Sequence, residues 1–397
     1  SVTGVQTCAL PISWIGLVEK NIKHFAACKM FGSNVLKTLG EAVVMNIKIF
    51  RKLGLIGAIL AMPVATATAQ VYDAPAGDAI AGQVSQAVSS VVASTVAAGV
   101  GSAVAGVISG GITPTAPTVT TSQAPVTRFF EGGNRGSSAG AKEKKMGVWV
   151  LGSYSDIEND NVNTAFDGDI VNVVGGVDYR FTNKIIGGVA VSFEKTDLDT
   201  TFNLGTFEID GVGVMPYVAF VLNNNLSADL SVGYTDLDFD TTRTSAGANV
   251  TGSYGGDRVT AGANLNYNKA AKKLTFGASL GFLYIKEEHD GFTESNGTVV
   301  AASDVSIGQG RASARVGYNL GKVQPFVAVR YEHEFWAPSD SIINGTLVET
   351  DTDGLVISGG LNFALSDAVS GGLTVSSHQA RDDLDLYSIS GRIRVAF

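Results

Sequence analysis

Apolar and polar residues alternate with a period of two along the chain from Gly147 to its last residue. In the stretch LTFGASLGFLYIKE, which begins at Leu274, the residues Leu, Phe, Ala, Leu, Phe and Tyr share one face, and Thr, Gly, Ser and Gly share the other. Such alternation predicts β-strands with one apolar face. Twelve segments of this kind begin near residues 147, 169, 185, 207, 226, 253, 274, 304, 323, 354, 368 and 385. Each is about ten residues or longer, which is enough for a tilted strand to cross a bilayer.

The connections between these segments alternate between short and long. Short ones lie near residues 182, 223, 270, 321 and 366, and longer ones lie near residues 157–167, 198–206, 240–252, 288–302, 337–352 and 380–384. Aromatic residues gather at the ends of the apolar faces, as they do at membrane interfaces. A soluble sandwich would explain neither feature. The sequence therefore predicts an all-β fold over residues 146–397: a closed, twelve-stranded antiparallel transmembrane β-barrel with short periplasmic turns and longer outer loops.

Seven charged residues fall on the polar face of the eighth, ninth and twelfth predicted strands. They are Arg311, Arg315, Arg330, Glu332, Glu334, Arg392 and Arg394. An arginine that faces lipid at mid-bilayer costs about 2–4 kcal/mol, so we expect all seven side chains to face the lumen. The pattern leaves two interpretations open. The charges either form an internal lattice of salt bridges or grip a plug or a transiting polypeptide.

Residues 70–145 differ in composition from the predicted barrel. They are rich in Ala, Gly, Ser and Val, and a Pro/Thr-rich stretch follows. From Ile80 to Ile108 a narrow apolar stripe recurs every three or four residues, which predicts a helix over residues 79–109. A flexible low-complexity linker is the alternative, because Val and Gly are indifferent helix formers. The low-complexity N-terminal segment is thus expected to be a short passenger-like or linker region.

Residues 45–69 have the three parts of a secretory signal peptide. A basic start is followed by an apolar run that is too short for a spanning helix of about 20 residues. Small residues then end the segment at Ala69, so we expect cleavage between Ala69 and Gln70. An inner-membrane anchor is the alternative interpretation.

The first residues of the chain do not resemble a protein N-terminus. Residues 2–12 match the translation of a common sequencing adapter, and residues 1–44 show no clear period or capping pattern. We therefore expect residues 1–44 to be non-native read-through, with a genuine N-terminal peptide as the alternative. Both cysteines, Cys8 and Cys28, would then precede the true start. The exported chain would lack disulfides and depend on backbone pairing or a core.

Composition and motifs narrow the classes of function. A formal net charge of −9 argues against a nucleic-acid partner. The sequence has no Gly-rich phosphate loop, zinc pattern or dinucleotide fingerprint, so we expect no cofactor, no bound metal and no enzymatic activity. One remote alternative is a hydrolase at the barrel rim, in which His378 would act with Asp382 and Asp383.

The final predicted strand, DLYSISGRIRVAF, resembles the C-terminal signature by which the barrel assembly machinery recognises outer-membrane barrels. The residues that carry this signature are Tyr387, Ile389, Ile393, Val395 and Phe397. Four further stretches, GVWVLGSYSD, GGVDYRF, LYIKEEHDGFTESNG and QPFVAVRYEHEFW, are similar to the β-domain of autotransporters, the proteins of type V secretion. The resemblance covers about residues 147–397.

This resemblance implies a monomeric barrel in the outer membrane of a Gram-negative bacterium. Its partners would be the barrel assembly machinery and the outer-membrane lipid and lipopolysaccharide around it. In that family the barrel is the translocation unit for an N-terminal passenger, and a helix before the first strand usually occupies the pore. The leading hypothesis is a barrel that anchors or translocates its own short N-terminal segment. A stand-alone pore or structural barrel is the alternative.

Overall fold

The computed structural model describes Ile80, Val84, Val88 and Val91 and then most of the chain from Lys144 onward. The described ranges are 144–161, 164–336, 341–343, 346–348, 352–366, 368–379, 381 and 384–397, with only the backbone described in 341–343 and 346–348. All of them belong to a compact unit that spans Ala69–Phe397. The predicted read-through (1–44), the signal peptide (45–69) and most of residues 70–145 lie outside the described residues. In the described part of the chain, no helix is both long and apolar enough to span a membrane.

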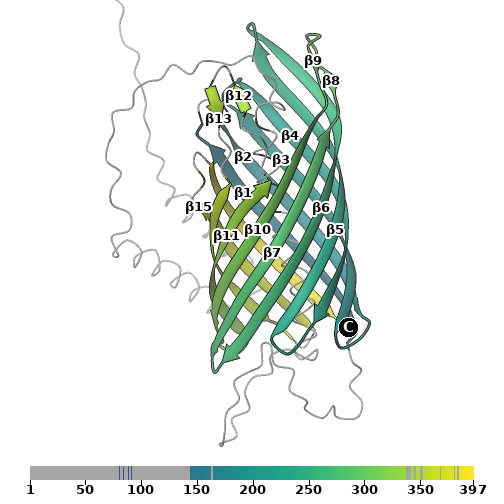
Figure 1. The fold of residues 1–397 in the computed structure, drawn as a ribbon, viewed down its shortest axis with the longest axis vertical. Coiled ribbons are helices and arrows are strands. Elements are labelled where there is room, and N and C mark those ends of the chain that lie inside the picture. Colours follow the sequence, from purple (N-terminus) through teal and green to yellow (C-terminus); the bar gives the residue numbers. More distant parts are fainter. Residues whose placement is uncertain are drawn as a thin grey trace, which may run out of the picture. The chain divides into compact units, whose positions relative to one another are not determined.

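A closed β-barrel forms the body of the molecule (Figure 1). Its strands are β1 (Met146–Asn159), β2 (Phe166–Arg180), β3 (Ile185–Thr200), β4 (Gly205–Val221), β5 (Leu226–Ser245), β6 (Ala248–Ala271), β7 (Leu274–His289), β10 (Ser303–Tyr318), β11 (Val323–Trp336), β14 (Asp353–Ala364), β15 (Val369–Gln379) and β16 (Leu384–Ala396). Each strand pairs antiparallel with the next one along the chain, and β16 pairs with β1. The predicted twelve-stranded antiparallel barrel is confirmed.

The two ends of the barrel differ in their connections. At the turn end, where β1 begins and β16 ends, the connections are short, as predicted. The opposite end, which we call the loop end, carries two further hairpins: β8 (Phe292–Thr293) with β9 (Val299–Val300), and β12 (Ser341–Ile343) with β13 (Thr346–Val348). Figure 1 shows β8 and β9 at the end opposite the C-terminus.

Two predicted long loops at the loop end are wrong. In place of the loop near 198–206, β3 and β4 are joined by residues 201–204 alone. In place of the loop near 240–252, β5 and β6 extend until only Ala246 and Gly247 remain between them. Both residues have positive φ, 48° and 79°, as a tight hairpin turn requires. The paired strands continue past the alternating segments because ladder hydrogen bonds need no membrane around them.

Burial alternates along the strands as the sequence pattern predicts. In β1, Trp149 and Leu151 point into the lumen and are 1 % and 3 % exposed, whereas Val148 and Val150 point outward and are 38 % and 52 % exposed. The exposed apolar side chains form the surface that meets lipid. Every strand thus presents one face to the bilayer and one to the lumen.

The last strand closes the barrel against the first. The backbone N–H of Phe397 donates to the carbonyl of Met146 at 2.9 Å, and the hydroxyls of Ser155 and Ser388 are 2.7 Å apart on the lumen side. Tyr387, Ile389, Ile393, Val395 and Phe397 alternate along the outward face, and all except the half-buried Val395 are more than 50 % exposed. Their role as an assembly signal stays a prediction.

The inward face of β2 gives a first test of this packing. A Cβ atom at Gly176 would lie 2.3 Å from two ring atoms of Trp149, which is buried. We expect Gly176→Ala to lower the free energy of unfolding by about 1–3 kcal/mol, because the buried indole has no room to move. Urea titration of the refolded barrel in lipid vesicles measures this change.

The matched control is Gly175→Ala, one residue earlier on the outward face. A Cβ atom there would lie 3.9 Å from its nearest neighbour. We expect a change within about 0.5 kcal/mol. Equal effects of the two substitutions would contradict the inward packing of Trp149 over Gly176.

Candidate functional site: the barrel lumen

Part of the N-terminal segment lies inside the lumen near the loop end. Ile80, Val84, Val88 and Val91 are helical, and their spacing places them on one helix face. Their exposed fractions are 0, 1, 0 and 6 %. They form one hydrophobic cluster with the inward-facing side chains Ile157, Phe166, Ile170, Leu198, Phe207, Ile209, Leu237, Phe239, Tyr254 and Leu386, and with Phe202 between β3 and β4. We call these wall residues the helix seat.

The helix seat is drawn from β1 to β6 and from β16, so it covers one side of the lumen near the loop end. Phe239 and Tyr254 stack within it with ring centroids 4.7 Å apart. The sequence left a helix and a flexible linker open for residues 79–109. The four described residues of that range are helical, and the others lie outside the described residues.

Toward the turn end, β1 to β4 continue the apolar wall with a second cluster. It consists of Trp149, Leu151, Val174, Ile186, Ala190, Met215, Tyr217 and Ala219. The indole N–H of Trp149 donates to the hydroxyl of Tyr217 at 3.0 Å, and that hydroxyl donates to Asp178 at 3.4 Å. Asp178 also accepts two hydrogen bonds from Arg394, at 2.6 and 2.7 Å. Arg394 is therefore held in a buried bidentate pair across the β1–β16 seam.

A second buried charge network lies on β3, β6 and β7, and the sequence analysis did not single it out. Arg258 donates to Glu194 and to Glu287, each at 2.5 Å, and all three side chains are at most 1 % exposed. The ring Nε2 of His289 lies 2.7 Å from Glu287. The residues on either side of Arg258 in β6 face outward, so the alternation along the strand could have predicted that Arg258 faces the lumen. Its partners could not, because β3 is not adjacent to β6.

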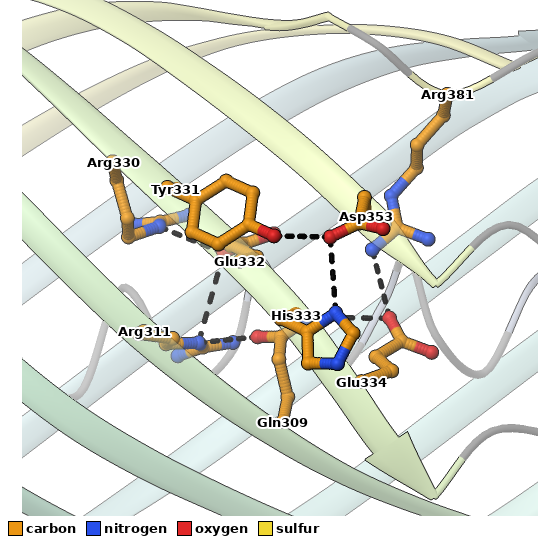
Figure 2. Close-up of polar contacts among 9 residues, drawn as sticks. All are labelled: Gln309, Arg311, Arg330, Tyr331, Glu332, His333, Glu334, Asp353 and Arg381. Atoms are coloured by element: carbon orange, nitrogen blue, oxygen red, sulfur yellow. Dashed lines mark hydrogen bonds and ion pairs between the residues drawn. The ribbon is translucent and has the colours of Figure 1, made fainter.

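Further lumen-facing arginines gather on β10, β11 and β16. Arg330 donates to Glu332 at 2.7 Å, and Arg311 lies 3.6 Å from the same carboxylate (Figure 2). Glu334 is bound instead by Arg381, at 2.8 Å. Arg315 lies over the ring of Phe326, 3.6 Å from its centroid. Arg392 faces the lumen from β16, close enough to Arg315 for their charges to repel.

The seven charges singled out in the sequence therefore face the lumen but form no single lattice. Arg394 pairs with β2, on the other side of the seam, and Glu334 pairs with an arginine beyond the end of β15. Only Arg311, Arg330 and Glu332 of the seven share ion pairs with one another in the part of the chain that is described. The alternation predicted the direction of each side chain, and the strand order decided its partner.

His378, the residue of the remote hydrolase hypothesis, also faces the lumen and is 8 % exposed. Its charged neighbours include Glu332, Arg330, Arg381 and Arg311. Asp382 and Asp383, which would orient it in a hydrolase, lie outside the described residues. The predicted lack of enzymatic activity stays a prediction.

The β8–β9 hairpin packs against the loop end of the helix seat. Arg243 of β5 donates to both carboxylate oxygens of Glu294, at 2.8 and 2.6 Å, and both side chains are at most 5 % exposed. Phe292 stacks on Tyr254 with ring centroids 4.5 Å apart and packs against the cluster that contains the helix. This hairpin and the helix therefore share one apolar surface.

Aromatic side chains mark two levels on the outer face. Tyr154, Phe193, Tyr234 and Tyr331 lie toward the loop end, and Tyr179, Phe181, Tyr267 and Tyr318 lie toward the turn end; all are exposed. Tyr154, Tyr234 and Tyr331 each donate to an aspartate on the adjacent strand, namely Asp169, Asp257 and Asp353. Figure 2 shows Tyr331 and His333 pointing to Asp353. The two levels bound the lipid-facing band.

Carboxylates crowd the outer face beyond the loop-end aromatic level. The negative charge of Asp160 is the main cause that raises the pKa of the Glu158 carboxyl above its usual range, and burial, Asp167, Asp385 and Asp156 add to it. Mutual repulsion of this kind is expected where acids share a solvated rim. The rim thus carries a concentrated negative charge at the loop end.

Comparisons with known proteins agree with this geometry. A family model described as the autotransporter β-domain matches residues 148–376. The translocator domain of the autotransporter NalP from Neisseria meningitidis has a TM-score of 0.56 at 12 % identity, covering 66 % of this chain and 90 % of that one. The β-domain of the Bordetella autotransporter BrkA has a TM-score of 0.54 at 16 % identity, covering 64 % of this chain and 100 % of that one. These likenesses show the fold, and no curated protein matches the sequence.

The buried Arg258 network gives a second test. We expect Arg258→Met to lower the free energy of unfolding by about 3–5 kcal/mol, because the buried carboxylates of Glu194 and Glu287 then lose the positive charge of the arginine that bridges them. Urea titration in lipid vesicles measures the loss. Adding Glu194→Gln and Glu287→Gln to the same variant should recover much of it, since the two buried carboxylates that had faced Arg258 are then neutral.

The control for this test is Lys195→Met on the outer face. Lys195 pairs with Asp197 at 2.8 Å, and the two side chains are 47 % and 53 % exposed. An exposed pair of this kind contributes less than about 1 kcal/mol. A loss as large as that of Arg258→Met would contradict the burial assigned to the network.

Proposed function

The chain belongs to the autotransporter β-domain family and lies in the outer membrane of a Gram-negative bacterium, and on this premise we propose that its barrel anchors or translocates the short segment of residues 70–145. The observation that carries the proposal is the burial of Ile80, Val84, Val88 and Val91 in the helix seat. A segment that contacts the lumen wall lies on the path through the membrane.

The seat suits a segment that arrives through the lumen and then stops. Burying one Val or Ile side chain stabilises by about 1.5–3 kcal/mol, so four of them hold the helix firmly. The rest of residues 70–145 is rich in Ala, Gly and Ser, whose small side chains fit a confined passage. In this proposal, the residues before Ile80 emerge at the loop end, because the helix lies there and β1 begins at the turn end.

The same proposal assigns the partners. The C-terminal residues on the outward face of β16 would be read by the barrel assembly machinery, and the band between the aromatic levels would contact lipid and lipopolysaccharide. The barrel would act as a monomer, without a nucleic-acid partner and without enzymatic activity. The alternative, a stand-alone pore or structural barrel, differs in one measurable respect, since its lumen would conduct with the N-terminal segment in place.

Conductance tests whether the helix closes the lumen. The chain from Gln70 onward is refolded into planar bilayers beside the double variant Val84→Asp, Val88→Asp. We expect the unchanged chain to conduct little and the variant to conduct severalfold more, because charged side chains cannot stay in the apolar seat. The control, Leu204→Asp with Val299→Asp, adds the same charge at sites that are 58 % and 77 % exposed. If the unchanged chain conducts as well as the variant, the pore alternative is favoured.

Surface accessibility tests translocation itself. An epitope is placed after Gln70 in the full chain, and intact cells are probed with antibody and with external protease. We expect labelling of intact cells, and protease should remove it while the barrel stays in the membrane. The Val84→Asp, Val88→Asp variant separates anchoring from export. If its epitope reaches the cell surface but is not retained there, the helix seat is what anchors the segment. Labelling only after the outer membrane is permeabilised would overturn the proposed translocation.

A further inference from the structure

A groove lies on the outer face of the barrel, where the lipid-facing band meets the acidic rim. It runs over β2, β3, β4 and β5 and has a volume of about 320 Å³. Sites for small ligands begin at about 300 Å³, so the groove has room for part of a lipid. Apolar side chains line it toward the turn end, and charged ones line it toward the loop end and on β5.

The apolar side chains of the groove are neighbours in the sheet. Val173 pairs with Phe193, and Phe193 pairs with Val212. Their exposed fractions are 43, 56 and 54 %. Phe193 belongs to the loop-end aromatic level, so these side chains lie at the edge of the lipid-facing band. An acyl chain in the groove would cover apolar surface of all three.

Lys195 is the positive group of the groove. Its ammonium nitrogen lies 2.8 Å from Asp197 and 3.8 Å from both Glu208 and Asp210. A lysine ammonium carries three N–H donors, and only Asp197 is near enough to accept a hydrogen bond from it. Donors therefore remain for the phosphate group of a ligand.

Two carboxylates of the groove face like charges. Asp238 pairs in register with Asp210, and Asp236 pairs with Asp257. Like charges directly opposite each other are unfavourable. In the described ranges, neither Asp236 nor Asp238 takes part in an ion pair. A positive group of a ligand would relieve the repulsion at both.

We propose that the groove binds a phospholipid whose headgroup carries a primary ammonium group, as phosphatidylethanolamine does. An acyl chain lies against Phe193 and Val212, the phosphate binds Lys195, and the ammonium binds Asp236 and Asp238. A headgroup with a phosphate and no ammonium would meet the surplus of carboxylates without relieving it. The site deepens the lipid contact proposed above and rests on it, but it does not require export of the N-terminal segment.

Competition between lipids, followed by native mass spectrometry, tests the site. The full chain, refolded in detergent, receives equal amounts of phosphatidylethanolamine, phosphatidylcholine and phosphatidylglycerol with identical acyl chains. We expect phosphatidylethanolamine to be retained about threefold to fivefold more than either competitor, the factor that an exposed charge pair contributes. Phosphatidylcholine lacks the ammonium N–H donors, and phosphatidylglycerol lacks the ammonium itself. Equal retention of the three lipids would overturn the proposal.

Two variants separate the contacts of the headgroup. Asp236→Asn with Asp238→Asn removes the ammonium contacts and should abolish the preference over both competitors. Lys195→Met removes the phosphate contact and should lower the retention of phosphatidylethanolamine about threefold. A preference that survives the aspartate substitutions would show that the ammonium does not bind there, and the proposed site would be wrong.

The matched control is Glu288→Gln with Asp304→Asn. These exposed residues face each other across β7 and β10, and neither lines the groove. Glu288 also pairs with an exposed lysine, Lys286, as the acids beside Lys195 do. The control should keep the lipid preference of the unchanged chain. A loss as large as that of the aspartate variant would reduce the effect to net charge and contradict the site.

Lipopolysaccharide is the competing occupant, because its phosphates could approach the carboxylates through a divalent cation. Purified lipopolysaccharide with Mg²⁺ should leave phosphatidylethanolamine bound, and a displacement that a chelator reverses would overturn the assignment. Insertion of each protein into vesicles is checked by heat-modifiable migration in gels. A chain that inserts but shows no lipid preference keeps its membrane location while the site is wrong. A chain that does not insert would contradict the membrane location itself.

Discussion

The structure depends on one constraint: backbone N–H and C=O groups inside a bilayer must find their partners within the protein. An unsatisfied group in hydrocarbon costs several kcal/mol, so a sheet can cross the membrane only if it closes. Here closure is made between β1 and β16, whose register runs from Gly147 with Ala396 to Asn159 with Leu384. Once the sheet is closed, each residue's place in the alternation fixes whether it meets lipid or lumen.

The lumen that closure creates is not uniform, and this asymmetry gives the N-terminal segment one preferred side. The helix seat is built from large apolar side chains on β1 to β6 and β16, such as Phe207 and Leu237. The wall of β10 to β15 presents arginines and small polar residues such as Ser313 and Ser358. A helix with a narrow apolar stripe can bury that stripe only on the first wall. The stripe of Ile80, Val84, Val88 and Val91 has this form.

The sequence was enough to predict the barrel, its strand number and the direction of the lumen charges, because a period of two and the cost of charge in lipid are local properties. It could not identify the partners. Arg394 and Asp178 are 216 positions apart and meet only because β1 lies between their strands. Arg258 bridges Glu194 and Glu287 from strands on different sides of it. The long hairpin of β5 and β6 was missed because residues 241–245, at the outer end of β5, are all polar.

The contrast between the two walls also bears on how the described helix residues are held in the lumen. Well-packed apolar residues of similar volume often stabilise a protein as much as a buried ion pair does, or more. An apolar wall on both sides would nevertheless enclose the helix on all faces. With charges and small polar groups on one wall, the lumen stays compatible with water there, and the apolar stripe of Ile80, Val84, Val88 and Val91 is buried on the other wall. Separating this stripe from the helix seat would leave every pairing of the barrel strands intact.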